Sequence, residues 1–461
     1  MRFNSYEFVV FFAALLALLP FFPGRKRHRL LLAASYVFYG AWNVPFVALL
    51  VFTTTLDYVS GGRIARAATP ARKRVWLFFS LLGNLGPLFY FKYGNFFLEN
   101  VAFVAQVNPE PFYLHVVIPL GISFYTFESL SYTLDMYRGN REPCKSFLDF
   151  ALFVTFFPHL VAGPILRTSE FLPQLKRTTP ISESEVVRGV ELFLLGLFKK
   201  VVVADNLALL ADAVFASPKG YSGAAVLAGT WAFWAQIYCD FSGYSTMAQG
   251  LASMLGFWFP KNFDYPQLRH NPLEYRRTWH ITLGNWITDY VYRPLGGSRV
   301  GDLRFAFNLV FTWMLLGLWH GAAWNFVLWG TYNGVILAIY SVGMRRKRWA
   351  LPAFPGKKFC GWLLIVASNL LSSIFFRSHS AADVGGLLSR LFTWAPGREV
   401  APAWWAVLAL LLGVHALSFW HYQEDLLLRL RWPGRIALIT ATVLAIACLG
   451  AGGRPFIYFQ F

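Results

Sequence analysis

Charge is scarce in this sequence, and its scarcity sets the class of protein. Only 14% of the 461 residues are charged and 56% are hydrophobic, whereas a typical soluble domain carries about 25% charged residues. Many stretches reach the ~20 mostly apolar residues that a bilayer-spanning helix needs. The composition therefore excludes an ordinary soluble globular protein and predicts an all-α polytopic membrane protein.

Cysteine is scarce as well, and the four cysteines show no paired spacing and no CxxC pattern. Isolated cysteines of this kind are typical of small apolar side chains rather than of disulfide partners or metal ligands. No Cys/His cluster or carboxylate pair has the spacing of a metal site either. We therefore expect no bound metal and no disulfide framework.

Acidic residues are outnumbered, because 41 Lys and Arg stand against 23 Asp and Glu, for a formal charge of +18. In a soluble protein this balance would suggest a nucleic-acid partner. In this chain the basic residues stand between apolar runs, where the positive-inside rule places them in cytoplasmic loops against anionic lipid headgroups. We expect membrane lipid, and no nucleic acid, as their partner.

The basic clusters also indicate a topology. Those at 25–29 and 63–74 flank an apolar stretch that is too long for one pass and is broken near Trp42-Asn43-Val44-Pro45. A tight hairpin with both clusters on the cytoplasmic side explains this pattern. A second helical hairpin is predicted, with one helix over residues 76–104 and the returning helix over residues 112–136.

The remaining apolar runs complete a single membrane domain over residues 1–461, with about eleven spanning helices. Residues 147–166 contain FFPHLVAGP and have basic flanks on both sides, which predicts a broken or re-entrant helix. Residues 261–304 are too polar to span and too aromatic for a free loop, which predicts interfacial or re-entrant helices. Further spans are expected at 186–209, 224–256, 305–318, 324–342, 360–375, 404–417 and 435–449.

Two of the nine histidines stand out by their surroundings. His320 lies in LGLWHGAAWN between two apolar segments, and His280 lies in RRTWHIT. An ionisable side chain at membrane depth is a candidate functional group because placing it there is costly. The alternative is a histidine that hydrogen-bonds a neighbouring helix and serves only packing. Nearby glycines allow a ligand or backbone to approach closely, which favours the functional interpretation of His320.

The stretch 280–325 resembles the signature of membrane-bound O-acyltransferases, in particular the bacterial branch that acetylates alginate or transfers D-alanine to teichoic acid. The alginate-type blocks are the closer match, and the resemblance runs nearly end to end. It includes FKYGNFF (91–97), IPLGISFYTFESLSYTLDMYRG (118–139), FFPHLVAGPILR (156–167), QIYCDFSGYSTMAQGLASMLGFWFPKNFDYP (236–266), DYVYRPLGGSR (289–299) and FIYFQF (456–461).

The resemblance implies catalytic roles for two residues. The catalytic histidine of the family corresponds to His320 in the WHG element, and the second histidine corresponds to His280. The element around His280 reads RRTWH, so Thr278 stands where a second arginine often precedes tryptophan. The role of that arginine is therefore not carried over, whereas Trp279 and His280 match.

Acyl transfer from a thioester to a hydroxyl requires a base and a means of stabilising the oxyanion. We expect His320 to act as the base and His280 to orient it or contact the acceptor. Other residues are expected to bind substrate. Trp319, Trp324 and Asn325 would shape the pocket, while Arg276, Arg277 and Arg293 would receive donor phosphates or anchor lipid headgroups. Asp240 either pairs with a basic group or lines the pocket.

The predicted function is transfer of an acyl group, with acetyl favoured, from a cytoplasmic thioester to a cell-surface polysaccharide. The donor is acetyl-CoA or an acylated carrier protein, used as a substrate, and no bound cofactor is expected. The resemblance also implies the inner membrane of a bacterium and a separate extracytoplasmic acetyltransferase partner. Alternatives are D-alanyl transfer from a carrier protein, acylation of a protein or lipid, and a non-enzymatic polysaccharide or lipid transporter.

Overall fold

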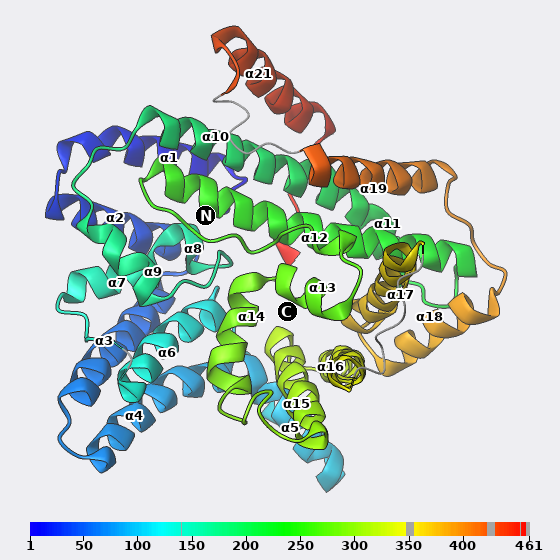
Figure 1. The fold of residues 1–461 in the computed structure, drawn as a ribbon, viewed down its shortest axis with the longest axis horizontal. Coiled ribbons are helices and arrows are strands. Elements are labelled where there is room, and N and C mark those ends of the chain that lie inside the picture. The colour runs from blue at the N-terminus through cyan, green and yellow to red at the C-terminus, as the bar shows by residue number, and fades with distance from the viewer. Residues whose placement is uncertain (140, 347–354, 422–428, 452, 458–461) are drawn as a thin grey trace. The chain divides into compact units, whose positions relative to one another are not determined.

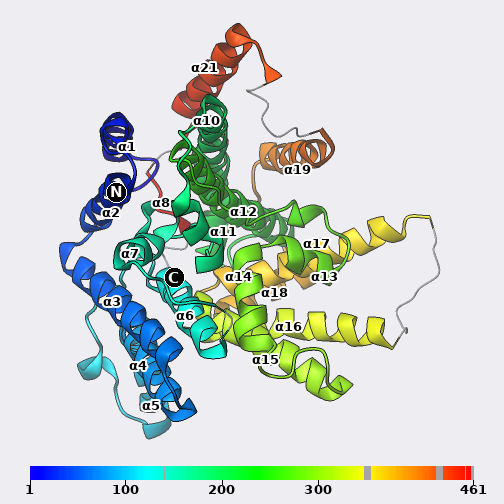
Figure 2. The same cartoon turned by 60° about the vertical axis from the view of Figure 1, so that its left-hand side comes forward.

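The computed structural model describes the whole chain except residues 140, 347–354, 422–428, 452 and 458–461. Throughout the described residues the regular elements are helices, apart from one isolated bridge between Tyr221 and Arg398. The expected all-α class is thus confirmed. The helices form two compact units, Met1–Phe193 with Met247–Pro260 and Leu194–Thr246 with Lys261–Phe461 (Figures 1 and 2).

The first unit holds nine helices of its own among the described residues. They are α1 (Tyr6–Leu18), α2 (Arg25–Gly40), α3 (Val44–Arg66), α4 (Pro70–Leu88), α5 (Gly94–Ala105), α6 (Ile122–Arg138), α7 (Phe147–Thr155), α8 (Phe157–Leu160) and α9 (Thr168–Phe171). Two further helices, α10 (Glu183–Phe198) and α12 (Gly223–Met254), contribute residues to both units.

The described part of the second unit holds the other helices. They are α11 (Asp205–Phe215), α13 (Pro272–Thr278), α14 (Ile281–Ile287), α15 (Asp302–His320), α16 (Trp324–Arg345), α17 (Lys357–Arg377), α18 (Ala381–Thr393), α19 (Ala403–His421) and α21 (Trp432–Leu449). Short π-helical segments at Phe89–Tyr93, Lys199–Ala204 and Thr288–Tyr292 join several of these elements.

The expected break in the first hairpin is present. Helix α2 ends at Gly40, and α3 begins at Val44 behind an extended Asn43. Pro45 occupies the first turn of α3, where its missing N–H costs no helical hydrogen bond. This local chemistry explains why the chain reverses at that point.

The second expected hairpin, over residues 76–104 and 112–136, differs from its prediction in where the returning helix begins. The returning helix was expected to begin near residue 112, but α6 begins only at Ile122. Gly121 has a φ of +73°, and a Cβ there would lie 2.6 Å from the carbonyl oxygen of Leu160. The left-handed backbone at this glycine sets the start of the helix, so residues 113–120 run as a non-helical approach.

The predicted break within residues 147–166 is confirmed. Helix α7 ends at Thr155, Phe156 leaves the helical region, and the four-residue α8 follows with Pro158 in its first turn. Whether this segment is re-entrant in a bilayer stays a prediction. His159 in α8 is fully buried and its Nδ1 lies 3.0 Å from Glu128 Oε1 of α6, so the break places a buried histidine–carboxyl contact in the first unit.

A second buried polar cluster lies between α3, α4 and α6, which lie side by side in Figure 1. Ser80 Oγ donates to Asp57 Oδ1 at 2.6 Å, and Asn84 Nδ2 donates to Asp57 Oδ2 at 2.8 Å. An unpaired carboxylate in this apolar setting would be costly, so these two donors are what make the buried Asp57 tolerable.

In the second unit, α15 and α16 pack through glycine at unusually short range. A Cβ at Gly330 would lie 2.2 Å from the carbonyl oxygen of Trp313, and one at Gly317 would lie 2.1 Å from that of Phe326. Any larger side chain at either position would collide with rigid backbone. The glycines therefore allow the helix pair to approach closely, and this approach places His320 beside residues of α16.

Four described helices are long and apolar enough to cross a membrane by length and composition: Pro70–Ala105, Trp324–Arg345, Lys357–Arg377 and Trp432–Leu449. Two shorter apolar helices occur at Tyr6–Phe21 and Ala403–Phe419. The expected number of about eleven spans stays a prediction, as does a single membrane domain. Residues 261–304 form only short helices before α15, too short to span, and their interfacial position also stays a prediction.

Candidate active site

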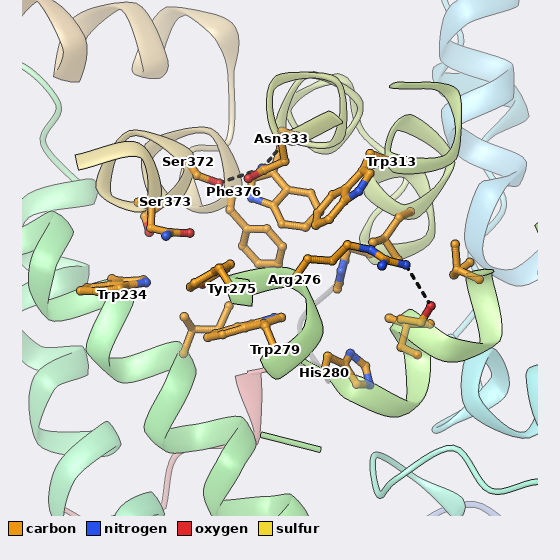
Figure 3. A pocket seen from close by; sticks show the side chains of 18 of the residues that line it. Trp234, Tyr275, Arg276, Trp279, His280, Trp313, Asn333, Ser372, Ser373 and Phe376 are labelled. Atoms are coloured by element: carbon orange, nitrogen blue, oxygen red, sulfur yellow. Dashed lines mark hydrogen bonds between the residues drawn. The ribbon is translucent and has the colours of Figure 1, made fainter. Parts of the chain in front are cut away.

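A pocket of about 90 Å³ lies inside the second unit and is lined by six helices, α12 to α17, and the turn between α13 and α14. Figure 3 labels side chains that line it from α12, α13, α15, α16 and α17 and from the turn that holds Trp279 and His280. The lining residues are Phe233, Trp234, Ile237, Tyr275, Arg276, Trp279, His280, Leu283, Gly284, Ile287, Thr312, Trp313, Leu316, His320, Trp329, Asn333, Asn369, Ser372, Ser373 and Phe376.

His320 is the last residue of α15 and is only 5% exposed. Three aromatic rings surround its imidazole, with ring centroids 4.9 Å away for Trp319, 5.0 Å for Trp329 and 5.4 Å for Phe376. All three meet it edge to face, which fixes the plane of the imidazole. The sequence therefore places a titratable ring in a largely apolar and rigid setting.

His280 lines the same pocket from the turn between α13 and α14. Its backbone is left-handed, with a φ of +43° and a ψ of +58°, which is uncommon for a residue other than glycine. Asn262 holds the turn: its carbonyl accepts from Ile281 N at 2.9 Å, and its side-chain oxygen accepts from Thr282 Oγ1 at 2.7 Å. Phe241 packs edge to face on the imidazole at 4.6 Å. Strain of this kind persists only where surrounding contacts enforce it.

Arg276 supplies the charged group among the lining residues. Its guanidinium donates to the hydroxyl of Thr288 and, at 3.5 Å, to the carbonyl oxygen of Gly284. In Figure 3 the side chain extends across the pocket between Tyr275 and Trp313. A positive charge is thus held in the wall of the pocket that both histidines line, and no carboxylate is among the described lining residues.

The opposite wall is polar and comes from α16 and α17. Asn333 Nδ2 donates to the carbonyl oxygen of Trp329 at 2.8 Å and to Ser372 Oγ at 2.9 Å, the latter drawn in Figure 3. Ser373 Oγ donates to the carbonyl oxygen of Asn369 at 2.8 Å. Neighbouring serines therefore differ in the use of their hydroxyl groups, since Ser372 accepts whereas Ser373 donates.

The structure brings three of the predicted site residues together in this pocket: His320, His280 and Arg276. Trp319 contacts His320 but does not line the pocket. Trp324 is 60% exposed at the start of α16. Asn325 is buried, and its Nδ2 donates at 2.8 Å to the carbonyl oxygen of Ser378, just beyond the end of α17.

The other predicted substrate contacts also lie outside the pocket. Asp240 Oδ1 lies 2.6 Å from Lys200 Nζ, and Asp240 Oδ2 accepts from the backbone N–H of Ile457 at 2.6 Å. Arg277 is exposed. Arg293 is exposed too and pairs with Asp289 on the neighbouring turn at 2.6 Å. The ion pair of Asp240 corresponds to the structural alternative expected for it.

Sequence reasoning missed the polar wall of Asn333, Asn369, Ser372 and Ser373. These residues lie in strongly apolar stretches of α16 and α17, where single polar side chains give no local motif. The only available signal was their polarity within predicted spans, which favours interhelical hydrogen bonding. Among the described residues no three His, Cys, Asp or Glu side chains gather as a metal site.

Residues 144–376 match the membrane-bound O-acyltransferase family, and this match contains every lining residue of the pocket. The chain belongs to this family. It is accordingly a membrane O-acyltransferase, and the alternative of a non-enzymatic transporter is not supported. Of the terminal FIYFQF block that also suggested the family, residues 458–461 lie outside the described residues.

Curated relatives agree with the family assignment. The chain is 41% identical over 394 residues to a probable alginate O-acetylase of Azotobacter vinelandii, covering 83% of this chain and 78% of that protein. It is 35% identical to a peptidoglycan O-acetyltransferase of Helicobacter pylori, covering 76% and 71%. A teichoic acid D-alanyltransferase of Bacillus subtilis is more distant, at 24% identity over 51% of this chain and 62% of that protein.

Proposed function

We propose that this protein transfers an acetyl group from a cytoplasmic thioester towards a cell-surface polysaccharide, with His320 as general base. The observation that carries the proposal is the convergence of His320, His280 and Arg276 on one small pocket. The small volume of this pocket, about 90 Å³, favours a short acyl group such as acetyl over a long acyl chain.

The transfer step follows from the chemistry of the side chains. His320 takes the proton of the acceptor hydroxyl as its oxygen attacks the thioester carbonyl carbon. The resulting tetrahedral oxyanion collapses, the carbon–sulfur bond breaks, and the imidazolium returns the proton to the departing thiolate. His280 contacts the acceptor or orients His320. Aromatic rings around His320 exclude water, which limits hydrolysis of the thioester.

Ser372 is the best-placed donor for the oxyanion. Both amide protons of Asn333 are used, one on Trp329 and the other on Ser372 Oγ. Among the described residues none accepts the hydroxyl proton of Ser372, so that proton is available to the pocket. The fixed Asn333 amide orients the hydroxyl before the reaction, which is the arrangement that stabilises developing charge effectively.

Arg276 is proposed to bind a phosphate of the donor. Its guanidinium is held by Thr288 and Gly284 with its charge towards the pocket, and a fixed guanidinium suits phosphate recognition. Arg277 and Arg293 are exposed and do not line the pocket, and are better explained as surface cations near lipid headgroups. The donor is a coenzyme A thioester or an acylated carrier protein, with coenzyme A favoured.

The acceptor and location are inferred from the relatives. Two of them are named for the O-acetylation of alginate and peptidoglycan, which supports a polysaccharide acceptor outside the cytoplasm. An inner-membrane location brings the cytoplasmic donor and that acceptor to opposite faces of one protein. A separate extracytoplasmic acetyltransferase is proposed to complete the transfer. D-alanyl transfer from a carrier protein is the second candidate, supported by the more distant D-alanyltransferase.

The donor assignment is tested with purified protein in nanodiscs. Release of free thiol is measured with acetyl-CoA, with acetyl carrier protein and with D-alanyl carrier protein, in the presence of polysaccharide fragments. Turnover of acetyl-CoA supports the proposal. Turnover of only the D-alanyl carrier protein would establish the second candidate instead. A protein that uses long-chain acyl-CoA as well as acetyl-CoA would contradict the size argument.

A further inference from the structure

A second cavity is formed by the first unit alone. Its volume is about 1290 Å³, which exceeds the ~300–1,000 Å³ of pockets for drug-sized ligands. Its walls come from the end of α1, the start of α2, residues 142–149, residues 172–181 and the chain around the end of α12. A cavity of this size is suited to a ligand much larger than a single ion.

The wall of this cavity is strongly cationic. Five Lys and Arg side chains line it, against two carboxylates. The cations are Arg25, Arg27, Lys145, Lys176 and Arg177, and the carboxylates are Glu142 and Asp149.

Two of the cations are held in place by the end of α12. Arg27 donates to the carbonyl oxygen of Leu255, and Arg177 Nη1 donates to that of Gly256 at 3.2 Å. Carbonyl groups at a helix C-terminus lack intrahelical partners, so these bonds satisfy them. Glu185 also pairs with Arg177, through an Nη2–Oε2 contact of 2.8 Å. These two guanidinium groups therefore form a fixed positive wall rather than a mobile one.

The other three cations are available to a ligand. Arg25, Lys145 and Lys176 are exposed, and none is within ion-pair distance of a carboxylate among the described residues. Asp149 is already engaged, because His28 Nδ1 lies 3.1 Å from its Oδ1. The cavity thus carries a surplus of positive charge that the protein itself does not neutralise.

Two helix N-termini add to this charge. Helix α2 has 16 residues and begins at Arg25, next to Gly24, while α7 has 9 residues and begins after Ser146. Gly24 and Ser146 both line the cavity. The N-terminus of a helix carries partial positive charge and favours anions.

The rest of the wall is apolar. Leu16 and Leu19 come from the end of the first apolar helix, and Leu175, Val186 and Phe257 line the cavity from other segments. Phe257 also lies beneath the guanidinium of Arg27, at 5.6 Å from its ring centroid. Cationic and apolar surfaces therefore meet in one cavity, as an amphiphilic ligand requires.

We propose that this cavity binds an anionic phospholipid, with the phosphate at Arg25, Lys145 and Lys176 and the acyl chains along the apolar wall. Free phosphate, or the phosphates of a soluble nucleotide, share the headgroup chemistry. They would leave the apolar wall unfilled, so the lipid is the better match. The proposal is independent of the reaction assigned to the pocket around His320.

Native mass spectrometry of the full-length purified protein tests the lipid site. The probes are phosphatidylglycerol and phosphatidylcholine of equal chain length. The wild type is expected to retain phosphatidylglycerol about tenfold more tightly. Lys145→Gln/Lys176→Gln is expected to lower that affinity about tenfold. The matched control is Lys26→Gln/Lys73→Gln, because these two lysines do not line the cavity and their loss changes net charge equally; it is expected to change affinity less than twofold.

Equal retention of the two lipids would overturn the proposal, as would equal loss in the two double variants. Inorganic phosphate and glycerophosphoglycerol, which lacks acyl chains, are added as competitors in separate arms. If either displaces phosphatidylglycerol at comparable concentration, the ligand is a soluble phosphate and not a lipid. Arg25→Gln provides a milder variant should the double variant fail to fold. It is expected to lower phosphatidylglycerol affinity about threefold, and an unchanged affinity would count against the site.

Discussion

At the scale of single residues, the left-handed backbone of His280 allows the role of its imidazole to be tested separately from the role of its backbone conformation. Asparagine tolerates a positive φ better than alanine does, so His280→Asn keeps the turn while removing the imidazole. We expect the unfolding temperature of His280→Asn to lie within about 1 °C of the wild-type value. The unfolding temperature of His280→Ala should be lower than that of His280→Asn. Both variants should lose at least about tenfold in kcat.

The comparison is made by thermal unfolding and acetyl transfer in the same detergent. Full activity in His280→Asn would mean that His280 serves only the turn between α13 and α14.

The two neighbouring serines of α17 give a sharper test of the oxyanion donor. Ser372→Ala removes a hydroxyl that lines the pocket and accepts from Asn333, whereas Ser373→Ala removes one that donates to the carbonyl oxygen of Asn369. Loss of one oxyanion donor typically costs about 10²–10³ in kcat. We therefore expect Ser372→Ala to lower kcat by about 100-fold with little change in KM, and Ser373→Ala to lower it by less than tenfold.

Single-turnover rates distinguish the two serine variants from the wild type. Equal losses in both would remove Ser372 from the mechanism and leave the pair a packing role.

The predicted site residues that line the pocket are those that stand next to a local sequence signal. His320 and His280 lie in recognisable elements, and Arg276 precedes one of them, and all three line the pocket. Trp324 and Asn325 do not line the pocket, because the chain breaks between α15 and α16 and residues close in sequence to His320 are carried away from it. Four residues after His320, a new helix begins at Trp324, whose side chain is 60% exposed.

At the scale of elements, the close approach of α15 and α16 determines the geometry around His320. A Cβ at Gly330 would lie 2.2 Å from the Trp313 carbonyl oxygen, whereas one at Gly385 in α18 meets nothing within 4 Å. Overpacking of this kind costs about 1–3 kcal/mol. We expect Gly330→Ala to lower both the unfolding temperature and kcat, and Gly385→Ala to lower neither.

Unfolding curves and transfer rates for the two variants provide the readout. An unperturbed Gly330→Ala would show that the helix pair can separate without cost to the site.

The ion pair between Arg177, before α10, and Glu185, in the first turn of α10, offers an element-scale prediction with a defined pH dependence. The Arg177 guanidinium holds the pKa of Glu185 at about 2, below its usual value of 4.5. Because the folded pKa is depressed, the stabilising contribution is present above pH 4.5 and is lost as the pH falls towards 2. The pair is partly exposed, so its effect is small. Glu185→Gln should lower the unfolding temperature by about 1–2 °C at pH 7, and by less at pH 3.

Glu110→Gln, at an exposed carboxylate, is the control for this measurement. A difference between Glu185→Gln and the wild type that grows on acidification would contradict the assigned sign.

Helix boundaries were predictable where a local residue such as proline marks them. They were not predictable where contacts between distant segments set the boundary. Pro45 and Asn43 marked the start of α3, and Pro158 marked the break after α7. The late start of α6 depends instead on Gly121 against the Leu160 carbonyl, a contact between segments far apart in sequence. The polar wall of α16 and α17 depends on tertiary contacts in the same way.

At the scale of the whole molecule, composition and basic clusters were sufficient for the membrane class and the all-helical architecture. They were not sufficient for the number of spans, because hydropathy does not separate a spanning helix from a buried apolar one of similar length. Helix α12 illustrates this: it has 32 residues, much of it buried within the protein, and is not among the helices that qualify as spans.

The central claim is that His320 supplies the base for acyl transfer, and the most direct test compares His320→Gln with the wild type. Acetyl transfer from acetyl-CoA is measured on purified protein in nanodiscs, after size-exclusion chromatography confirms that both are folded. His415→Gln is the matched control, because that histidine is in the same unit but does not line the pocket. We predict a loss of at least about 100-fold in kcat for His320→Gln and less than threefold for His415→Gln. A folded His320→Gln protein that transfers acetyl at the wild-type rate would contradict the claim.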